Sequence, residues 1–247
     1  MLIYSSFGSN SYYTELAENS FSEFKKIYPN SEKIIFTKSD LPQRYQEFAE
    51  KNSRGFGYWW WLSYLYKKLV EDINANDIIF WSDARSGFKK NKFDNISRKL
   101  FKIQWLENFI NTPLMDICAW QMDNHKEYEW TTADVLNEFD ISYNSKNASS
   151  GQFTNHFLTF RKNKNTKLFF EEFYKFSIEK KHLWLPKEYN LKNHSKFHEP
   201  RWLQSILSLM LKRNKQMLKI MKTSNKEIYR KGSIHPQIYK HHPEYKF

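Results

Sequence analysis

Short apolar runs alternate along this chain with stretches in which apolar residues recur at helical spacing. The apolar runs predict strands at Leu2–Ser5, Lys33–Thr37, Ile78–Trp81, Met115–Met122 and Phe153–Phe160. The amphipathic stretches predict helices at Thr14–Ile27, Asp94–Ile110 and Lys167–Ile178, after Pro42 as far as Ala49, and from Arg201 onward. Alternating strands and helices build a largely parallel sheet with helices on both faces. We therefore expect an α/β fold with a mixed, mostly parallel sheet flanked by helices.

The stretch Arg54–Phe88 combines a turn, a helix and a strand. Glycines at positions 55 and 57 predict a sharp backbone turn, and the next helix presents Trp61, Leu65 and Leu69 on one face. The following strand ends on Asp83. Ligands of α/β proteins gather beyond the carboxyl ends of strands, so Asp83 is the first candidate for a binding residue. The structural alternative is that Asp83 caps a turn or helix.

Two polar segments lack any periodicity and are expected to be loops. They are Asp140–Gly151, which is rich in Asn and Ser, and Lys180–His198, which contains Pro186 and three histidines. Long loops in a compact domain are usually functional or mobile. The residues between Asp123 and Trp130 are also polar and are predicted to form a loop before a short helix capped by Thr131 or Thr132.

Composition places the chain among globular proteins. Of its 247 residues, 40% are hydrophobic and 18% aromatic, with few Gly and Pro, so the chain is long and apolar enough to bury one large core. We expect one domain over residues 1–211 and a basic C-terminal extension over residues 212–247.

The positive charge is concentrated in that extension. Residues 212–247 hold ten Lys and Arg against two Glu, so they carry +8 of the formal net charge of +12. A basic segment with interspersed apolar residues can bind anionic lipid, bind nucleic acid or remain a solvated end. Nucleic acid is disfavoured because the body lacks a basic helix or an aromatic β-motif. Attachment to an anionic membrane surface is the remaining functional interpretation.

The expected compartment is the cytoplasm, with peripheral attachment to the cytoplasmic face of the membrane. The N-terminus does not resemble a signal peptide, and no run approaches the ~20 apolar residues that span a bilayer. Cys118 is the single cysteine, which excludes an internal disulfide and suits a reducing environment. We interpret it as a buried core thiol.

The common catalytic and binding motifs are not present. The sequence contains no Walker loop, zinc-ligand spacing, nucleophile elbow or dinucleotide fingerprint. What remains is an apolar strand that ends in an aspartate and follows an aromatic helix. This pattern is typical of proteins that hold a nucleotide diphosphate through a carboxylate and a divalent ion.

Five ordered landmarks resemble a family of bacterial and viral glycosyltransferase-like proteins of the GT-A type, associated with surface polysaccharide synthesis (capsule, O-antigen and lipopolysaccharide). The landmarks are Arg54-Gly-Phe-Gly-Tyr-Trp-Trp-Trp, Asp77-Ile-Ile-Phe-Trp-Ser-Asp-Ala, Glu129-Trp-Thr-Thr-Ala-Asp134, Ser150-Gly-Gln152 and Arg201-Trp-Leu-Gln-Ser-Ile-Leu-Ser-Leu. The resemblance runs from about residue 50 to residue 211. It implies a Rossmann-like, GT-A-type domain that binds a nucleotide-sugar donor over the carboxyl edge of the sheet.

The residues that match the family motifs, together with Arg85 and Glu199, which do not match them, lead us to expect roles for individual residues. The residues expected to bind the donor or its diphosphate are Asp83, Arg85, Arg54, Tyr58, Gln152, Arg201 and Gln204. Asp134 or Glu199 would orient or deprotonate the acceptor hydroxyl. Asp83 would hold ribose or a Mn²⁺ or Mg²⁺ ion bound to the diphosphate.

The chain departs from the family pattern at three places. Leu62 and Ser63 follow Trp61 where Lys-Pro is usual, Arg85 replaces a glycine, and Trp202-Leu203 replaces His-Asp. Either the site is built differently here or some activity has been lost. Arg85 could neutralise the diphosphate without a metal, since a planar guanidinium suits phosphate oxygens. The alternative is a surface ion pair with Asp83, which would contribute little.

Taken together, the sequence predicts a glycosyltransferase that moves a sugar from a nucleotide-diphosphate donor to a glycan or lipid-linked acceptor. Two alternatives stay open. A non-catalytic protein of the same fold that binds nucleotide sugars or glycans would explain the apolar replacements. A basic nucleic-acid-binding protein would explain the charged extension.

Overall fold

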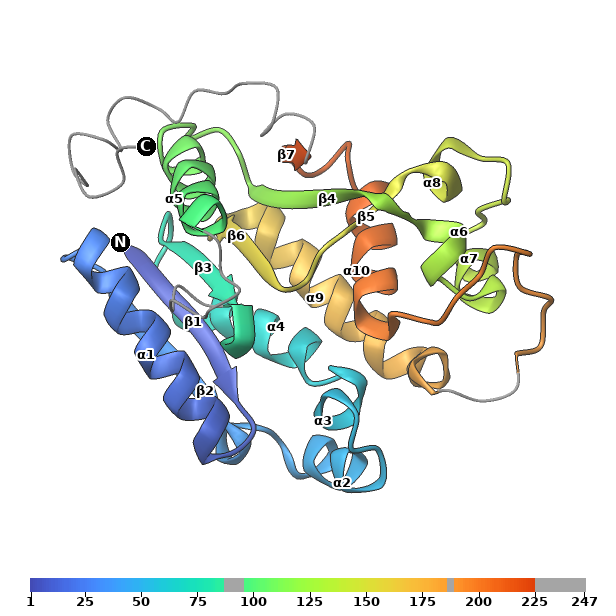
Figure 1. Cartoon of the computed structure of the whole chain (residues 1–247), viewed down its shortest axis with the longest axis horizontal. Helices are drawn as coiled ribbons and strands as arrows, with labels where there is room; N and C mark the ends of the chain where they lie inside the picture. Colours follow the sequence, from blue (N-terminus) through green and yellow to red (C-terminus); the bar gives the residue numbers. More distant parts are fainter. Residues whose placement is uncertain (87–95, 186–188, 225–247) are drawn as a thin grey trace.

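The computed structural model describes residues 1–86, 96–185 and 189–224 (Figure 1). A single sheet runs through this part of the chain. Its strands are β1 (Leu2–Gly8), β2 (Glu32–Thr37), β3 (Ile78–Ser82), β4 (Ile117–Lys126), β5 (Gly151–Phe153), β6 (Phe157–Arg161) and β7 (Ile220–Ser224). The strand order is β2-β1-β3-β6-β4, after which β4 pairs with both β5 and β7.

The sheet is mixed, as expected. β1 pairs in parallel with β2 and β3, and β4 pairs in parallel with β7. β6 is antiparallel to both of its neighbours, β3 and β4, and β5 is antiparallel to β4. Five strands therefore point one way, and the carboxyl ends of β1, β2, β3 and β4 lie at the same edge.

Helices cover both faces of the sheet and surround it. They are α1 (Ser11–Ile27), α2 (Gln43–Lys51), α3 (Gly55–Tyr58), α4 (Leu62–Asp72), α5 (Ile96–Ile110), α6 (Glu127–Trp130), α7 (Ala133–Glu138), α8 (Lys146–Ser149), α9 (Lys164–Glu179) and α10 (Trp202–Arg213), with short 3₁₀ turns η1 (Lys38–Asp40), η2 (Ala84–Ser86) and η3 (Lys181–Trp184). The α/β fold class predicted from the sequence is confirmed.

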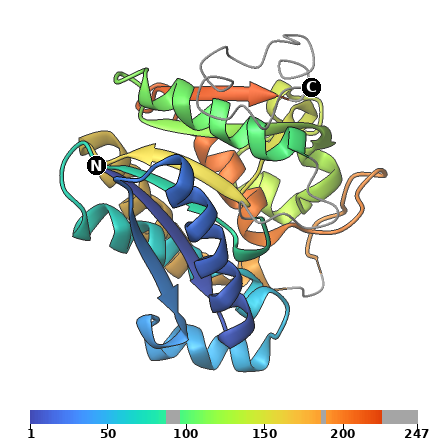
Figure 2. The same cartoon turned by 60° about the vertical axis from the view of Figure 1, so that its left-hand side comes forward.

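Two apolar cores separate these layers. The smaller core packs α1 and α5 against one face, through residues such as Phe24 and Leu106. The larger core packs α4, α9 and α10 against the other face, with Leu65, Phe170 and Ile206 among its members. Figure 2 shows α1 and α5 lying in front of the strands. Successive side chains of a strand point to opposite faces of the sheet, so neighbouring strand residues join different cores.

Several segments differ from the sequence-based expectation. The predicted loop Asp140–Gly151 contains α8 and the first residue of β5, and the predicted loop Lys180–His198 contains η3. The predicted strand Phe153–Phe160 is divided into β5 and β6, with a break at residues 154–156. The predicted polar loop after Met122 is instead the end of β4 followed by α6. Polar side chains are compatible with this strand because its end is only half covered, and because β5 supplies the backbone partners of residues 121, 122 and 126.

The aromatic turn has the predicted glycine conformations. Gly55 and Gly57 have φ values of 58° and 85°, in the left-handed region. The ring of Trp59 occupies the space beside Gly55, where an added Cβ would approach it within 2.4 Å. Trp60 and Trp61 are buried, and Trp61 packs in the same core as Leu65 and Leu69, as predicted.

The basic extension begins inside the fold rather than after it. Lys212 lies in α10 and forms a buried ion pair with Glu127, 2.7 Å long. Ile220–Ser224 forms β7 at the edge of β4. The last basic positions, residues 226, 230, 231, 240 and 246, lie outside the described residues, so the domain boundary and the role of the extension stay predictions.

Candidate functional site

The carboxyl edge of the sheet contains a topological switch point. β1 has β2 on one side and β3 on the other, so the connections after β1 and β3 leave in different directions. Ligands of open α/β sheets bind in such a crevice. The connection after β1 is short: Gly8 ends the strand and Asn10 caps α1 by accepting from Tyr13 N–H at 3.1 Å. A Cβ on Gly8 would lie 2.2 Å from Thr14 Oγ1, so only glycine fits.

Asp83 lies on the other side of this crevice. Its N–H donates to the carbonyl of His156 at 2.7 Å, which extends the β3–β6 ladder by one residue. Its Oδ1 accepts from the N–H of Arg85 at 2.9 Å and so starts the 3₁₀ turn η2. Asp83 therefore caps this turn, as the structural alternative predicted, and the cap uses one of its two carboxylate oxygens.

The side chain of Arg85 extends from η2 across the switch point to α1. Its guanidinium lies over the ring of Tyr13, 4.9 Å from the centroid, and Nη2 donates to the Tyr13 hydroxyl. That hydrogen bond is the main reason why the pKa of Arg85 is raised. Tyr13 belongs to the first turn of α1, where unpaired N–H groups and the helix dipole favour anions. The exposed guanidinium and this helix end therefore give the crevice a positive character.

Few of the described side chains at this edge could act as metal ligands. Among the described residues, no group of three or more His, Cys, Asp or Glu side chains could hold a metal ion. Asp83 is half-buried and has already engaged Oδ1. A Mg²⁺ or Mn²⁺ ion held here would depend on one carboxylate and on the phosphates of a ligand, an arrangement that Mg²⁺ tolerates.

A second group of predicted residues gathers where the aromatic turn meets α10. The ring of Tyr58 stacks on Trp202 with 4.7 Å between centroids, and the guanidinium of Arg54 lies 4.4 Å from the Trp202 ring centroid. Arg54 also pairs with Glu199 at 3.2 Å, and both side chains are about half exposed. The Glu199 carboxylate is therefore paired with Arg54 in this structure.

Arg201 lies beside this group. Its guanidinium stacks on Trp130, 4.1 Å from the ring centroid, and burial lowers its pKa while Glu199 opposes the change. His125 and His198 contact the same Trp130 ring. Burial, and then the charge of Arg201, lower the pKa of His125, so its imidazole is neutral at pH 7.

Gln152 and Gln204, which the resemblance assigned to the donor, are buried instead. Gln204 Nε2 donates to Gln152 Oε1 at 2.7 Å, and Gln152 Nε2 donates to the hydroxyls of Thr131 and Ser205 at 3.0 and 3.1 Å. The exposed fractions of the two glutamines are 0% and 3%. They hold β5 against α10, so we assign them to positioning rather than to ligand contact.

The same network continues to a buried ion pair. Glu127 accepts from Thr131 at 2.9 Å and from Lys212 at 2.7 Å, and the hydroxyl of Ser208 donates to the same carboxylate oxygen as Lys212, Oε1. Neither partner of the pair is visible from the sequence, because Lys212 appears there as one more charge of the basic extension.

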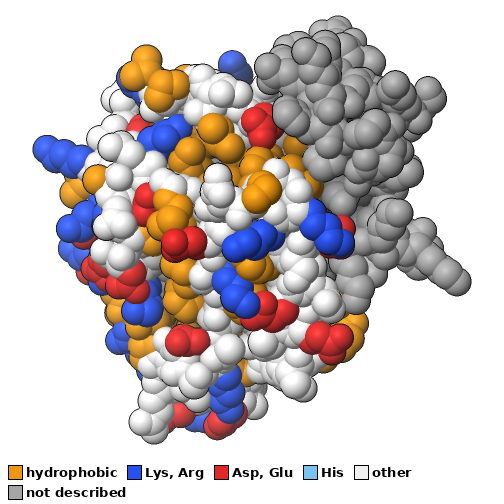
Figure 3. All heavy atoms as spheres, turned by 90° about the vertical axis from the view of Figure 1, so that its left-hand side faces the viewer, with side chains coloured by type: hydrophobic (Ala, Val, Ile, Leu, Met, Phe, Trp, Pro, Cys, Tyr) orange, Lys and Arg blue, Asp and Glu red, His pale blue; other side chains and the backbone are white. Residues whose placement is uncertain are grey.

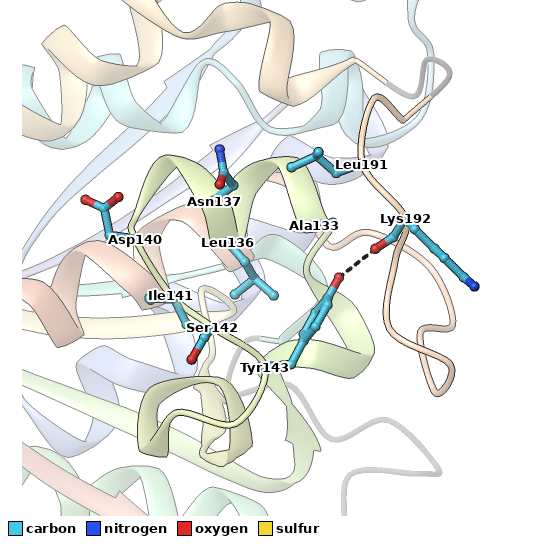
Figure 4. Close-up of a pocket in the computed structure, with 9 residues that line it drawn as sticks. All are labelled: Ala133, Leu136, Asn137, Asp140, Ile141, Ser142, Tyr143, Leu191 and Lys192. Carbon is cyan, nitrogen blue, oxygen red and sulfur yellow. Dashed lines mark hydrogen bonds between the residues drawn. The ribbon is translucent and has the colours of Figure 1, made fainter.

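Asp134 lies apart from these groups, on α7. The neighbouring residues of that helix line a surface hollow of about 560 Å³ (Figure 4). Leu191 and Lys192 form its opposite wall, and the Tyr143 hydroxyl joins the two sides by donating to the Lys192 carbonyl at 3.0 Å. The structure therefore does not bring Asp134 together with Asp83 and Arg85.

One carboxylate that sequence reasoning missed is Asp123. It was placed in a polar loop, but it lies in β4 near the carboxyl edge of the sheet. Its Oδ2 is buried and has no hydrogen-bond partner in the structure. The signal that could have found it is its position directly after Met122, the last residue of a predicted strand, just as Asp83 follows the strand before it.

Neither a protein-family model nor a curated protein matches the sequence. Among solved structures, a crystal structure of galactosyltransferase LgtC in complex with donor and acceptor sugar analogues aligns with 97% of this chain and 82% of its own, at 14% identity and a TM-score of 0.41.

Proposed function

We propose that this chain is a glycosyltransferase that binds a nucleotide-diphosphate sugar at the switch point between β1 and β3. The observation that carries the proposal is the convergence of Asp83, Arg85 and the first turn of α1 across that crevice. A carboxylate can accept from ribose hydroxyls, while the guanidinium and the helix end favour phosphate oxygens. The order of the five sequence landmarks supports the same class of ligand.

Leaving-group stabilisation is the main chemical task at this site. The nucleoside diphosphate leaves with negative charge, and fixed positive groups lower the barrier to its departure. Arg85 supplies such a group: its guanidinium contacts Tyr13, and among the described residues it forms no ion pair with Asp83. A divalent ion on Asp83 would supply further charge for the same purpose.

The group around Trp202 is proposed to contact the sugar or the acceptor. The Trp202 ring contacts Tyr58 and Arg54, and Arg201 is the N-cap residue of the same helix, α10. Aromatic rings and guanidinium groups that are already stacked lose little side-chain entropy when a sugar packs against them. The acceptor is proposed to be a glycan or a lipid-linked saccharide.

A thermal-shift panel of nucleotide sugars tests the donor site. A ligand that binds only the folded state raises the melting temperature. We expect at least one nucleotide-diphosphate sugar to do so, and Arg85→Ala to weaken that binding roughly 10-fold or more, since a charge-assisted bond contributes about 1.5–3 kcal/mol. Arg44→Ala, which removes an exposed arginine on α2, is the matched control.

The panel is repeated with excess chelator and with added Mn²⁺. Binding that survives chelation supports neutralisation by Arg85 alone, and binding that needs Mn²⁺ supports a metal on Asp83. If no nucleotide or nucleotide sugar changes the melting temperature in either condition, the proposal is wrong.

A non-catalytic nucleotide-sugar binder is the second candidate. It is favoured by the positions of Asp134 and Glu199, since one lies on α7 and the other pairs with Arg54. This candidate predicts donor binding without transfer or hydrolysis. Figure 3 shows one face of the molecule, on which Lys and Arg are interspersed with Asp and Glu. The nucleic-acid alternative rests on the basic extension, half of whose Lys and Arg lie outside the described residues, so it stays a prediction.

A further inference from the structure

The contact between the aromatic turn and the start of α10 has unusual backbone conformations. Of the six non-glycine residues with positive φ in the described part of the chain, four lie here: Phe56, Tyr58, Trp59 and Trp202, with φ between 36° and 59°. This left-handed region is sterically unfavourable for residues that carry a side chain. Strained backbone is concentrated at functional sites, where the surrounding contacts impose it, so this contact is a candidate ligand site.

The contact lies beside the carboxyl end of β1. The ring of Phe7, the penultimate residue of that strand, lies 5.9 Å from the Phe56 ring and 4.1 Å from the Trp61 ring, centroid to centroid. Tyr58, from the same turn, stacks on Trp202. These ring contacts connect the start of α10 to the edge of the sheet at which the donor is proposed to bind.

Arg201, the residue before Trp202, has a guanidinium without an acceptor. Its backbone N–H donates to the Trp130 carbonyl at 3.1 Å, and the guanidinium stacks on the Trp130 ring, 4.1 Å from the centroid. Stacking holds the guanidinium but satisfies none of its N–H groups, and no residue that the structure describes accepts a hydrogen bond from them. Arg54, by contrast, pairs with Glu199. A half-buried cation without an acceptor destabilises the folded state, so a ligand explains its retention here better than stability does.

The stacked guanidinium is suited to bind an anion. An arginine side chain carries five N–H donors in a planar fork that matches the paired oxygens of a carboxylate or phosphate. Stacking on Trp130 fixes the plane of this fork, so little side-chain entropy is lost on binding. Glu199, whose charge acts on the pKa of Arg201, is engaged by Arg54. Two guanidinium groups therefore face one carboxylate, and the balance of charge is positive.

The surrounding rings favour an anion that carries a sugar ring over a small inorganic one. Tyr58 is half-buried, and the exposed His198 ring lies 5.0 Å from the Trp130 ring, centroid to centroid. Sites for organic ligands are lined mainly by aromatic and apolar groups, with a few polar groups that fix the orientation. Here the aromatic faces would contact the sugar ring while the fork of Arg201 binds its charged substituent.

We propose that Arg201 binds the carboxylate or phosphate of an acidic saccharide at the start of α10, with Arg54 adding positive charge. The inference rests on the proposed glycosyltransferase function and names its acceptor class: a saccharide that carries a negative charge. Arg201 then holds the acceptor, while Asp83 and Arg85 hold the donor.

The first experiment compares three sugars with the same ring, namely methyl glucuronide, glucose 6-phosphate and methyl glucoside, by calorimetric titration without nucleotide. We expect one of the two anionic sugars to bind roughly 10-fold more tightly than neutral methyl glucoside, because hydrogen bonds between charged groups are the stronger ones. Preference for the glucuronide identifies a carboxylate, and preference for the phosphate identifies a phosphorylated saccharide. Equal binding of all three sugars would overturn the inference.

The second experiment repeats the titrations with variants whose melting temperatures show that they are folded. Arg201→Gln should reduce the preference for the anionic sugar to under about twofold, and Arg201→Lys, which keeps the charge but loses the planar fork, to about threefold. Arg44→Gln is the matched control, because Arg44 also stacks on an aromatic ring, that of Tyr45, and should leave the preference unchanged. A preference as large as that of the wild type in either Arg201 variant would overturn the inference.

The last experiment separates this site from the donor site. The titration is repeated at saturation with the nucleotide sugar found in the thermal-shift panel, and the affinity for the anionic sugar should change by less than about threefold. Displacement of the anionic sugar would overturn the inference and leave the proposed function intact, because Arg201 would then hold the donor diphosphate. If no nucleotide sugar binds but the anionic preference depends on Arg201, the glycosyltransferase proposal fails and the saccharide site stands.

Discussion

Two polar regions of this molecule differ in how completely their side chains are buried and hydrogen-bonded. Between β5, α6 and α10, Gln152, Gln204, Glu127 and Lys212 are buried and hydrogen-bonded to one another or to nearby hydroxyls. At the carboxyl edge of β1 and β3, Asp83 is half-buried and Arg85 is exposed; Asp83 accepts from the Arg85 N–H, and the Arg85 guanidinium donates to the Tyr13 hydroxyl. The buried region specifies how α10 docks, because any misplacement leaves polar groups unpaired. The proposed ligand would bind at the exposed edge.

The largest expected effect comes from breaking the buried ion pair. Lys212→Met leaves the Glu127 carboxylate buried without its cation, so we expect the free energy of unfolding to fall by about 3–5 kcal/mol. Arg213→Met is the control, because its pair with Glu172 is exposed and should contribute under ~1 kcal/mol. Urea denaturation measures both. Equal losses in the two variants would contradict the assignment of Lys212 to the core.

An intermediate effect is expected at Gln152. Gln152→Leu keeps the volume but leaves the buried amide of Gln204 without its acceptor. It also removes the donor to the hydroxyls of Thr131 and Ser205, which keep their bonds to Glu127 and to the Trp130 carbonyl. We expect a loss of about 2–3 kcal/mol in unfolding free energy, with nucleotide affinity of the folded protein unchanged within twofold. The exposed Gln43→Leu on α2 is the control. A large loss of affinity without loss of stability would return Gln152 to the donor-binding residues.

The smallest effect is expected at the exposed pair of Arg54 and Glu199. A double-mutant cycle with Arg54→Ala and Glu199→Gln should show a coupling of about 0.2–1 kcal/mol in unfolding free energy. Glu199→Gln should also leave Arg54 free to approach phosphate, so nucleotide affinity should rise two- to threefold by calorimetry, an order-of-magnitude expectation from exposed charge pairs. Affinity that falls instead would show that Glu199 contacts the ligand directly.

Much of the architecture could be predicted from local pattern. The first four elements, the aromatic turn, the strand before Asp83 and the helix after Arg201 all follow from apolar periodicity and from glycine and proline positions. The end of β4 could not be predicted, because Asp123 to Lys126 carry polar side chains and their strand conformation depends on pairing with distant β5. β7 was not predicted for a similar reason: it is short, it contains Lys222, and its strand conformation depends on pairing with distant β4.

The candidate site shows the same division. Asp83 and Arg85 were predicted to lie at the end of a strand, which is a local feature of the sequence, and the structure places them there. The burial of Gln152 and Gln204 could not be predicted, because a polar residue in a motif looks the same whether it faces a ligand or a neighbouring helix. Their role in donor binding stays a prediction.

The sequence alone was sufficient for the α/β class, the glycine-dependent turn and the strand-end aspartate, because these follow from short-range periodicity and backbone sterics. The tertiary structure decided which polar residues are buried, which of them pair and which stay exposed at the crevice. The physical reason is that burial and hydrogen bonding depend on segments far apart in the chain, such as Glu127 with Lys212 and Gln152 with Gln204.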